Sequence, residues 1–148
     1  PTIALRYFNV FGPRQNPASD YAAVIPKFIT AALAGAPATI FGDGHQTRDF
    51  TYIENVVLAN IRASAAPDAA LGQAFNIACG ERISLLELLA RIGRIVGHEP
   101  AVRHAPPRTG DIQHSLAGID KARTGLGYDP PVAFDEGLER TIGWYRRS

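Results

Sequence analysis

The stretch IFGDGHQTRDFTYI, residues 40–53, contains the local signals that bear most on the fold. It begins within a short run of β-forming residues, Ala38–Phe41, which predicts a strand. The glycines of Gly42–Gly44 supply positive φ angles and predict a turn that opens into a loop. Thr51 and Glu54 have the spacing of a capping box, which predicts the start of a helix. The stretch therefore predicts a strand, a charged loop and a helix in succession.

Similar patterns continue on both sides of this stretch. Thr2–Tyr7 predicts a buried strand and Ala74–Ala78 predicts another. Ser84 is followed three residues later by a glutamate, a second capping box that predicts a helix ending at Gly97. The run His104–Asp111 contains two prolines and a glycine and predicts an irregular loop. The positions that recur at helical spacing are Tyr21, Val24, Ile25, Phe28, Ile29 and Ala32; Ile53, Val56, Val57, Ile61 and Ser64; Leu85, Leu88, Leu89, Ile92 and Val96; and Phe134, Leu138, Ile142 and Tyr145.

Length and composition place the chain among ordinary globular proteins. Its 148 residues, 46% hydrophobic and 20% charged, are enough for one domain with a real core. The formal net charge of +1 gives no general attraction to nucleic acid or to acidic membranes, so neither is expected as a partner. Cys79 is the only cysteine, which excludes an intramolecular disulfide and fits a reducing cytoplasm. No membrane span or signal peptide is indicated.

Two groups of charged residues are candidates for binding an anionic ligand. Arg48 follows the glycine turn, and its guanidinium offers donors that match phosphate oxygens. Arg108 and Asp111 lie three residues apart and combine a phosphate donor with a carboxylate that can bind ribose hydroxyls. The alternatives are surface ion pairs, Arg48 with Asp49 or Asp43, and Arg108 with Asp111. From the residues alone, both interpretations stay open.

Several kinds of catalytic site find no support in the sequence. The four histidines and Cys79 lack the spacing of a zinc site, so no metal is expected. Cys79 is interpreted as a small core residue and not as a nucleophile. Ser115 has no base nearby in sequence that would make a hydrolase triad. The sequence has no Gly-x-Gly-x-x-Gly fingerprint and no tyrosine followed four residues later by lysine, so no catalytic residue is assigned.

Four segments resemble, in order and approximate spacing, the extended short-chain dehydrogenase/reductase family, particularly its UDP-sugar 4-epimerases. They are LRYFNVFGPRQ (residues 5–15), the stretch 40–53, FNI (residues 75–77) and RTGD (residues 108–111). The resemblance implies an α/β fold, namely the C-terminal substrate-binding part of a Rossmann-type enzyme. In that family fold, the first strand and residues 53–78 belong to the cofactor-domain sheet. Residues 1–148 are then the sugar-nucleotide-binding portion, and the N-terminal NAD-binding domain is expected to be absent from the chain.

The resemblance also implies roles for the residues that would meet the diphosphate and the sugar. Asn9 would lie where the substrate diphosphate meets the nicotinamide side. Arg48 and Arg108 would hold the diphosphate, and Asp111 would hold the ribose hydroxyls. Ser115 would border the sugar, where a small residue leaves room for an N-acetyl group.

Further roles are implied for the uracil base and for the cofactor. The segment that contains Val24, Lys27 and Phe28 would meet the uracil, and Phe41 would flank it. The residues implied to contact the NAD cofactor are Phe8, Asn9 and Val10.

The resemblance implies an isomerase of carbohydrate metabolism. Family members oxidise the sugar at C4 with NAD, rotate the keto intermediate and return the hydride to its opposite face. UDP-glucose and UDP-N-acetylglucosamine are the implied substrates of the parent enzyme, which is expected to be a cytoplasmic homodimer, whereas this chain alone is expected to be inactive. A 4,6-dehydratase or decarboxylase of the same family and a non-catalytic nucleotide-sugar-binding module stay open as alternatives. Because strands without neighbours expose unpaired edges, we also predict self-association or partial disorder.

Overall fold

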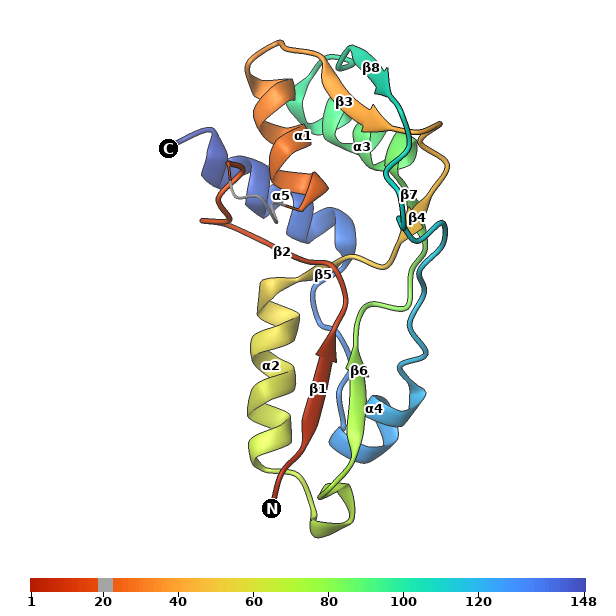
Figure 1. Cartoon of the computed structure of the whole chain (residues 1–148). Helices are drawn as coiled ribbons and strands as arrows, with labels where there is room; N and C mark the ends of the chain where they lie inside the picture. Colours follow the sequence, from red (N-terminus) through yellow and green to blue (C-terminus); the bar gives the residue numbers. More distant parts are fainter. Residues whose placement is uncertain (19–22) are drawn as a thin grey trace.

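The computed structural model describes residues 1–18 and 23–148, and strands and helices alternate along much of it (Figure 1). None of the helices in the described ranges is long and apolar enough to cross a membrane. In chain order the elements are β1 (Ala4–Tyr7), β2 (Val10–Phe11), α1 (Val24–Leu33), β3 (Ala38–Phe41), β4 (Thr47–Arg48), β5 (Thr51–Tyr52), α2 (Ile53–Ser64), a 3₁₀ turn (Asp68–Ala70), β6 (Ala74–Ile77), β7 (Ile83–Ser84), α3 (Leu85–Val96), β8 (Val102–Ala105), α4 (Asp120–Leu126) and α5 (Phe134–Tyr145).

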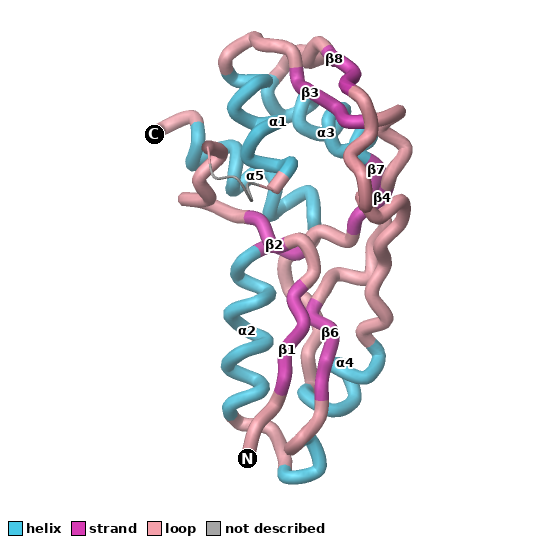
Figure 2. The backbone as a smooth tube through the Cα atoms, viewed as in Figure 1, coloured by secondary structure: helices cyan, strands magenta, loops and turns pink. Residues whose placement is uncertain are grey.

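The molecule is elongated and divides into two lobes, which lie at opposite ends of Figure 1. The helical lobe consists of α1, α3 and α5 with the strand pair β3–β8. The strand lobe consists of the pair β1–β6 with α2 and α4. Figure 2 shows the short strand β2 between the lobes, and a long loop that runs from β8 down one side of the molecule to α4. The chain therefore crosses between the lobes several times.

The strands of the described residues pair two by two. The pairs β1–β6, β2–β5 and β3–β8 are parallel, whereas β4–β7 is antiparallel. Parallel neighbours joined through helices are characteristic of α/β folds, in agreement with the fold class expected from the sequence. In the β3–β8 pair, Phe41 at the end of one strand lies opposite Ala105 at the end of the other. The chain that continues toward Arg108 therefore starts beside the glycine turn.

The helical lobe contains the larger core. Its α3 begins at Ser84, whose Oγ accepts a hydrogen bond from the backbone N–H of Glu87 (3.1 Å), and it ends at Gly97 with φ of 100°, as predicted. The Glu87 carboxylate accepts from Arg91 and not from the start of the helix. The largest fully buried side chains of this core are Phe11, Phe28, Ile25, Ile29, Ile40, Ile83, Leu88, Ile92 and Leu138.

The core of the strand lobe is smaller, and much apolar surface stays exposed around it. Tyr7 of β1 is 47% exposed, and Ile53, Val57 and Ile61 of α2 are 40%, 51% and 60% exposed. These three α2 residues form a row on one side of the helix. The buried residues of the strand lobe are Val56, Ala59, Ala70, Phe75, Ile77, Ala122, Leu126 and Tyr128.

Three sequence predictions for the strand lobe are wrong. The capping box of Thr51 and Glu54 does not form, because Thr51 belongs to β5 and its buried hydroxyl has no partner among the described residues. The face of α2 predicted to be buried is mostly exposed, and the buried residues are Asn55, Val56 and Ala59. Strand β1 is exposed or half-buried, since β6 is its only strand neighbour in the described part of the chain.

The remaining differences concern boundaries and one helix. The short helix α4 was not predicted, because its 7 residues bury only Ala122 and Leu126, a single pair at helical spacing. The predicted loop His104–Asp111 overlaps the end of β8, and the loop after Gly42–Gly44 contains β4. Tyr21, predicted in the first helix, lies outside the described residues.

Candidate functional site

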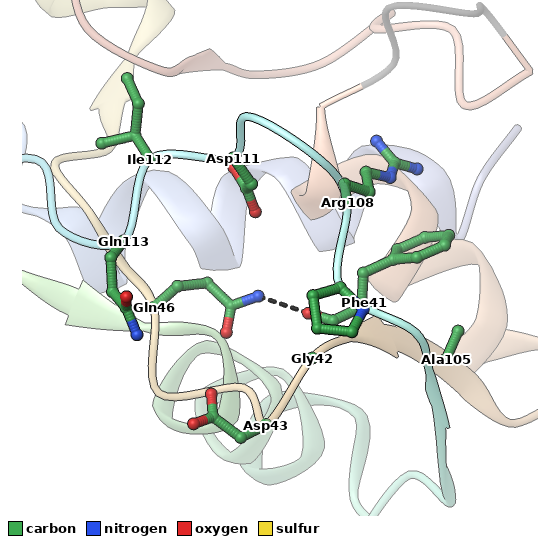
Figure 3. A pocket seen from close by; sticks show the side chains of 10 residues that line it. Phe41, Gly42, Asp43, Gln46, Ala105, Arg108, Asp111, Ile112 and Gln113 are labelled. Atoms are coloured by element: carbon green, nitrogen blue, oxygen red, sulfur yellow. Dashed lines mark hydrogen bonds between the residues drawn. The ribbon is translucent and has the colours of Figure 1, made fainter.

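Two adjoining cavities lie between α1, the end of β3 and the loop after β8. The inner cavity has a volume of about 200 Å³, and the outer, more open cavity has a volume of about 610 Å³. Figure 3 shows the outer cavity, with side chains from the glycine turn on one side and from the loop after β8 on the other. The side chains that line both cavities are those of Phe41, Gln46, Arg108 and Asp111.

The inner cavity gathers residues that lie far apart in the sequence. Of the substrate-binding residues expected from the resemblance, it brings together Asn9, Val24, Lys27, Phe28, Phe41, Arg48, Arg108 and Asp111. Ser115 lines neither cavity, but its backbone N–H donates to the Thr47 carbonyl (3.1 Å), beside Arg48. The residues that the resemblance implies for nucleotide binding, apart from Ser115, therefore surround one cavity.

The residues expected at the cofactor lie less close together. Only Asn9 lines the cavity, whereas Phe8 packs against a small cluster around Ala117 and Val10 pairs with Thr51 in the β2–β5 pair. Asn9 has a positive φ of 32°, and its side-chain amide donates to the backbone carbonyl of Asp49 (3.0 Å). The connection between β4 and β5, which contains Asp49, therefore fixes the conformation of Asn9.

Arg48 is oriented by two acceptors at the mouth of the cavity. Its Nη1 donates to the carbonyl of Thr47 (2.8 Å), and its Nη2 forms an ion pair with the carboxylate of Asp111. The side chain of Arg48 is 15% exposed and that of Asp111 is 38% exposed. The surface pairing of Arg48 with Asp49 or Asp43, one of the interpretations left open by the sequence, is therefore wrong.

Arg108 lies over the ring of Phe41 (Figure 3). The guanidinium carbon is 4.0 Å from the ring centroid, a distance at which cation–π attraction orients the side chain. The alternative ion pair between Arg108 and Asp111 does not form, and the two residues are joined through the backbone, where Asp111 N–H donates to the Arg108 carbonyl (3.3 Å). Arg108 makes no ion pair within the described ranges, so its charge is available to a ligand.

Asp49 was considered only as a surface partner of Arg48, but its side chain is completely buried. Its carboxyl oxygens accept from the backbone N–H groups of Cys79 and Gly80 (both 3.1 Å) and Ala117 (3.2 Å). Burial raises the pKa of Asp49, and the hydrogen bond from Ala117 is the largest of the contributions that oppose the rise. Asp49 thus joins chain segments that are not adjacent in sequence.

Cys79 lies beside this buried carboxyl. Burial, with a smaller contribution from the nearby Asp49, raises the pKa of the Cys79 thiol to about 11. At neutral pH the side chain is therefore a thiol and not a nucleophilic thiolate. It is half-buried and lies outside the hydrophobic clusters of the described residues, so its interpretation as a core residue is wrong. Within the described ranges, no three histidine, cysteine or carboxylate side chains are grouped so that they could hold a metal ion.

Sequence reasoning missed several residues that line the inner cavity, among them Thr39, Gln46 and Leu85. Thr39 could have been found, because strand alternation places it on the same face as Phe41. Gln46 could not have been found, since only the three-dimensional fold places its Nε2 2.6 Å from the carbonyl oxygen of Phe41. Its buried Oε1 has no partner among the described residues.

The chain is similar to proteins that act on UDP-sugars. It is 41% identical to UDP-glucose 4-epimerase of Mycolicibacterium smegmatis, over 93% of this chain and 43% of the relative. It is 34% identical to UDP-N-acetyl-alpha-D-glucosaminuronate decarboxylase of Bacillus cytotoxicus, over 99% of this chain and 46% of the relative. The chain thus spans less than half the length of these relatives.

A solved structure of a UDP-sugar 4-epimerase is also similar to this chain. UDP-N-acetylglucosamine 4-epimerase from Methanobrevibacter ruminantium, solved in complex with UDP-N-acetylmuramic acid, superimposes with a TM-score of 0.91 at 40% identity, over 98% of this chain and 46% of that one. This likeness confirms the fold class predicted from the sequence. Residues 1–78 match the model of the NAD dependent epimerase/dehydratase family. The chain therefore belongs to the NAD dependent epimerase/dehydratase family.

Proposed function

We propose that this chain is the substrate-binding half of an NAD-dependent UDP-sugar 4-epimerase and holds the nucleotide part of the substrate in the inner cavity. The observation that carries the proposal is that the guanidinium groups of Arg48 and Arg108 line one cavity together with the ring of Phe41, over which Arg108 lies. Planar guanidinium groups suit the oxygens of a diphosphate, and an aromatic face suits a base. The likeness to enzymes that act on UDP-sugars supports the same ligand.

The ion pair between Arg48 and Asp111 implies an order of events when the substrate binds. Diphosphate oxygens would compete with the Asp111 carboxylate for the Nη2 group of Arg48. Asp111, once released, would accept hydrogen bonds from ribose hydroxyls, which are neutral donors. Val24 and Phe28 of α1 would enclose the base together with Phe41, and Lys27 would add positive charge at the rim.

The cofactor would lie at the edge of this site. When bound, the nicotinamide of NAD accepts a hydride from the sugar and later returns it. Asn9 fits a place beside it, because its side chain lines the cavity and its backbone is held in an unusual conformation at the end of β1. Phe8 and Val10 would contact the cofactor only near Asn9. The sequence has neither a glycine fingerprint nor a Tyr-x-x-x-Lys motif, so we propose that the chain alone does not catalyse the reaction.

The sugar is the part of the substrate that the cavity defines least. Ser115 is small and lies beside Thr47 next to the cavity mouth, which supports room for an N-acetyl group. UDP-glucose and UDP-N-acetylglucosamine are therefore the proposed substrates, and a homodimer is the proposed form of the complete enzyme.

A decarboxylase of the same family is the second candidate, favoured by the 34% identity to the Bacillus cytotoxicus enzyme. The two reactions can be distinguished in an assay of an enzyme that joins this sequence to an NAD-binding half. An epimerase interconverts UDP-glucose and UDP-galactose with no release of carbon dioxide. A decarboxylase releases carbon dioxide from a UDP-linked uronic acid.

The binding proposal is tested by calorimetric titration of the chain with UDP, UDP-glucose and UDP-N-acetylglucosamine. We expect Arg108→Ala to weaken UDP binding about 10- to 100-fold, because it removes charge-assisted hydrogen bonds worth about 1.5–3 kcal/mol. The matched control is Arg62→Ala, which removes an exposed arginine of α2 in the strand lobe.

Equal affinities of the wild type and Arg108→Ala would place the diphosphate elsewhere and contradict the site. An equal loss of affinity in Arg62→Ala would show that binding depends on overall charge and not on the cavity. If a folded wild-type chain bound no UDP, the enzyme that includes the NAD-binding half would be titrated with the same variants.

A further inference from the structure

The segments that carry the candidate site meet at one buried residue, Asp49. Its backbone continues directly from Arg48, and its carbonyl oxygen accepts from the side-chain amide of Asn9 (3.0 Å). Its carboxyl group accepts from the two N–H groups of Cys79–Gly80, which follow β6, at 3.1 Å each. It also accepts from the N–H of Ala117 (3.2 Å), at the end of the loop that leaves β8. One side chain therefore touches the connections of both lobes.

The bond to Ala117 has a direct consequence for the cavity. Residues 106–117 form most of the loop between β8 and α4, which carries Arg108 and Asp111 (Figure 1). Near its start, Arg108 rests on Phe41 and Asp111 pairs with Arg48 at the surface. In its middle, the backbone of Thr47 donates to the Gln113 carbonyl (2.9 Å) and accepts from the Ser115 N–H (3.1 Å), and at its end the buried carboxyl of Asp49 accepts from Ala117. The position of this loop therefore depends on Thr47 and Asp49, the two residues that flank Arg48 in the sequence.

We propose that Asp49 is a positioning residue for nucleotide-sugar binding, which fixes the loop 106–117 relative to Arg48 so that both guanidinium groups face one diphosphate. Asp49 itself lines neither cavity and is fully buried, so it acts through the backbone groups that it holds. Only the identity of the ligand rests on the function proposed above. The anchoring of the loop is a property of the fold and can be measured without a ligand.

The three donors explain why a carboxyl group is required at this position. Oδ1 accepts from Cys79, and Oδ2 accepts from both Gly80 and Ala117. An asparagine has only one acceptor oxygen, and with that oxygen in the place of Oδ2 it would lose the bond from Cys79 but still accept from Gly80 and Ala117. Asp49→Ala removes both oxygens and leaves all three N–H groups without this partner.

The test combines amide hydrogen exchange with UDP titration on the wild type and Asp49→Ala. The control is Tyr128→Phe, which removes another buried hydrogen bond, from the Tyr128 hydroxyl to the Ala78 carbonyl (3.0 Å), one residue before Cys79. In Asp49→Ala we expect exchange in residues 106–117 to become at least about tenfold faster and UDP affinity to fall at least about tenfold. Exchange in the centre of α3 should stay unchanged, and Tyr128→Phe should leave both the loop and UDP affinity unchanged.

Each outcome decides between anchoring and a general structural role. Equal exchange of the loop in Asp49→Ala and the wild type overturns the proposal, as does faster exchange of the loop in both variants alike. Faster exchange with unchanged UDP affinity overturns the role in binding. If the wild type binds no UDP while Asp49→Ala loosens the loop, the proposed function fails and the anchoring stands.

Discussion

The two lobes are built from similar elements, but they differ in how completely they bury their apolar residues. In the helical lobe, α1, α3 and α5 enclose side chains such as Leu88 and Leu138, which have no exposed surface. In the strand lobe, α2 leaves Val57 and Ile61 more than half exposed. The lobe that contains most of the cavity wall thus has the core to hold its own shape, whereas the strand lobe presents an apolar surface that no described residue covers.

The largest expected effect follows from this difference in burial. Leu88→Ala in the core of the helical lobe should lower the free energy of unfolding by about 2–5 kcal/mol, because it leaves a cavity between three helices. Leu126→Ala in the short helix α4, 5% exposed, should cost less, since the smaller strand-lobe core can collapse around it. Urea denaturation of both variants measures the difference. A larger loss for Leu126→Ala would reverse the comparison.

Cys79, at the junction between the lobes, should react slowly with alkylating reagents. Because the pKa of Cys79 is raised from 9.0 to about 11, its thiolate fraction at pH 8 is about a hundredfold lower than that of an ordinary cysteine. Alkylation of the folded chain at pH 8 should be slower by a similar factor, and should accelerate as the pH approaches 11. The same chain in denaturant provides the reference rate. Equal rates in the folded and unfolded chain would show that the junction opens readily.

Substitutions at two glycines of α5 test how closely this helix packs against Tyr52 of β5. A Cβ at Gly137 would lie 2.8 Å from Tyr52, so Gly137→Ala should lower the free energy of unfolding by about 1–3 kcal/mol. A Cβ at Gly143 meets no atom closer than 3.7 Å, so Gly143→Ala should raise it by about 0.5–1 kcal/mol through helix propensity. Thermal unfolding of the pair checks the signs. Stabilisation by both variants would mean that α5 does not pack closely on Tyr52.

The smallest effect is expected on the exposed row of α2. Val57→Gln should change the free energy of unfolding by no more than about 0.5 kcal/mol, because the side chain is already half in water. Its neighbour Val56, 5% exposed, serves as the control, and Val56→Gln should be clearly destabilising because it buries an amide. If both variants were equally harmful, the face of α2 that contains Val57 would be covered in solution, as self-association of this chain would cause.

Local sequence signals predicted the elements whose ends are determined by residues close by in the sequence. The helix α3 was found because Ser84 caps it and Gly97 ends it. The helix α2 was found as well, but its buried face was not, because its apolar row of Ile53, Val57 and Ile61 is mostly exposed while a polar residue, Asn55, is buried. Periodicity shows which face is apolar and not what covers that face.

The candidate site shows the same limit. The family resemblance predicted that Arg48, Arg108 and Asp111 contact one substrate, and the structure brings the three residues to one cavity. The partner of Arg48 lies 63 residues away in sequence, and the donors to Asp49 lie 30 to 68 residues away. No local pattern contains such distances, so the sequence offers Asp49 only as one possible surface partner of Arg48, whereas the structure shows that Asp49 is buried.

The most direct test of the account is a map of backbone chemical-shift changes when UDP is titrated into the isotopically labelled chain. The account predicts that the changes concentrate at the inner cavity, in α1 around Lys27, at Phe41, at Arg48 and in the loop that carries Arg108. The strand lobe, including α4, should be unaffected. Changes confined to the strand lobe, or spread evenly over the charged surface, would contradict the claim that this cavity is the nucleotide-binding site.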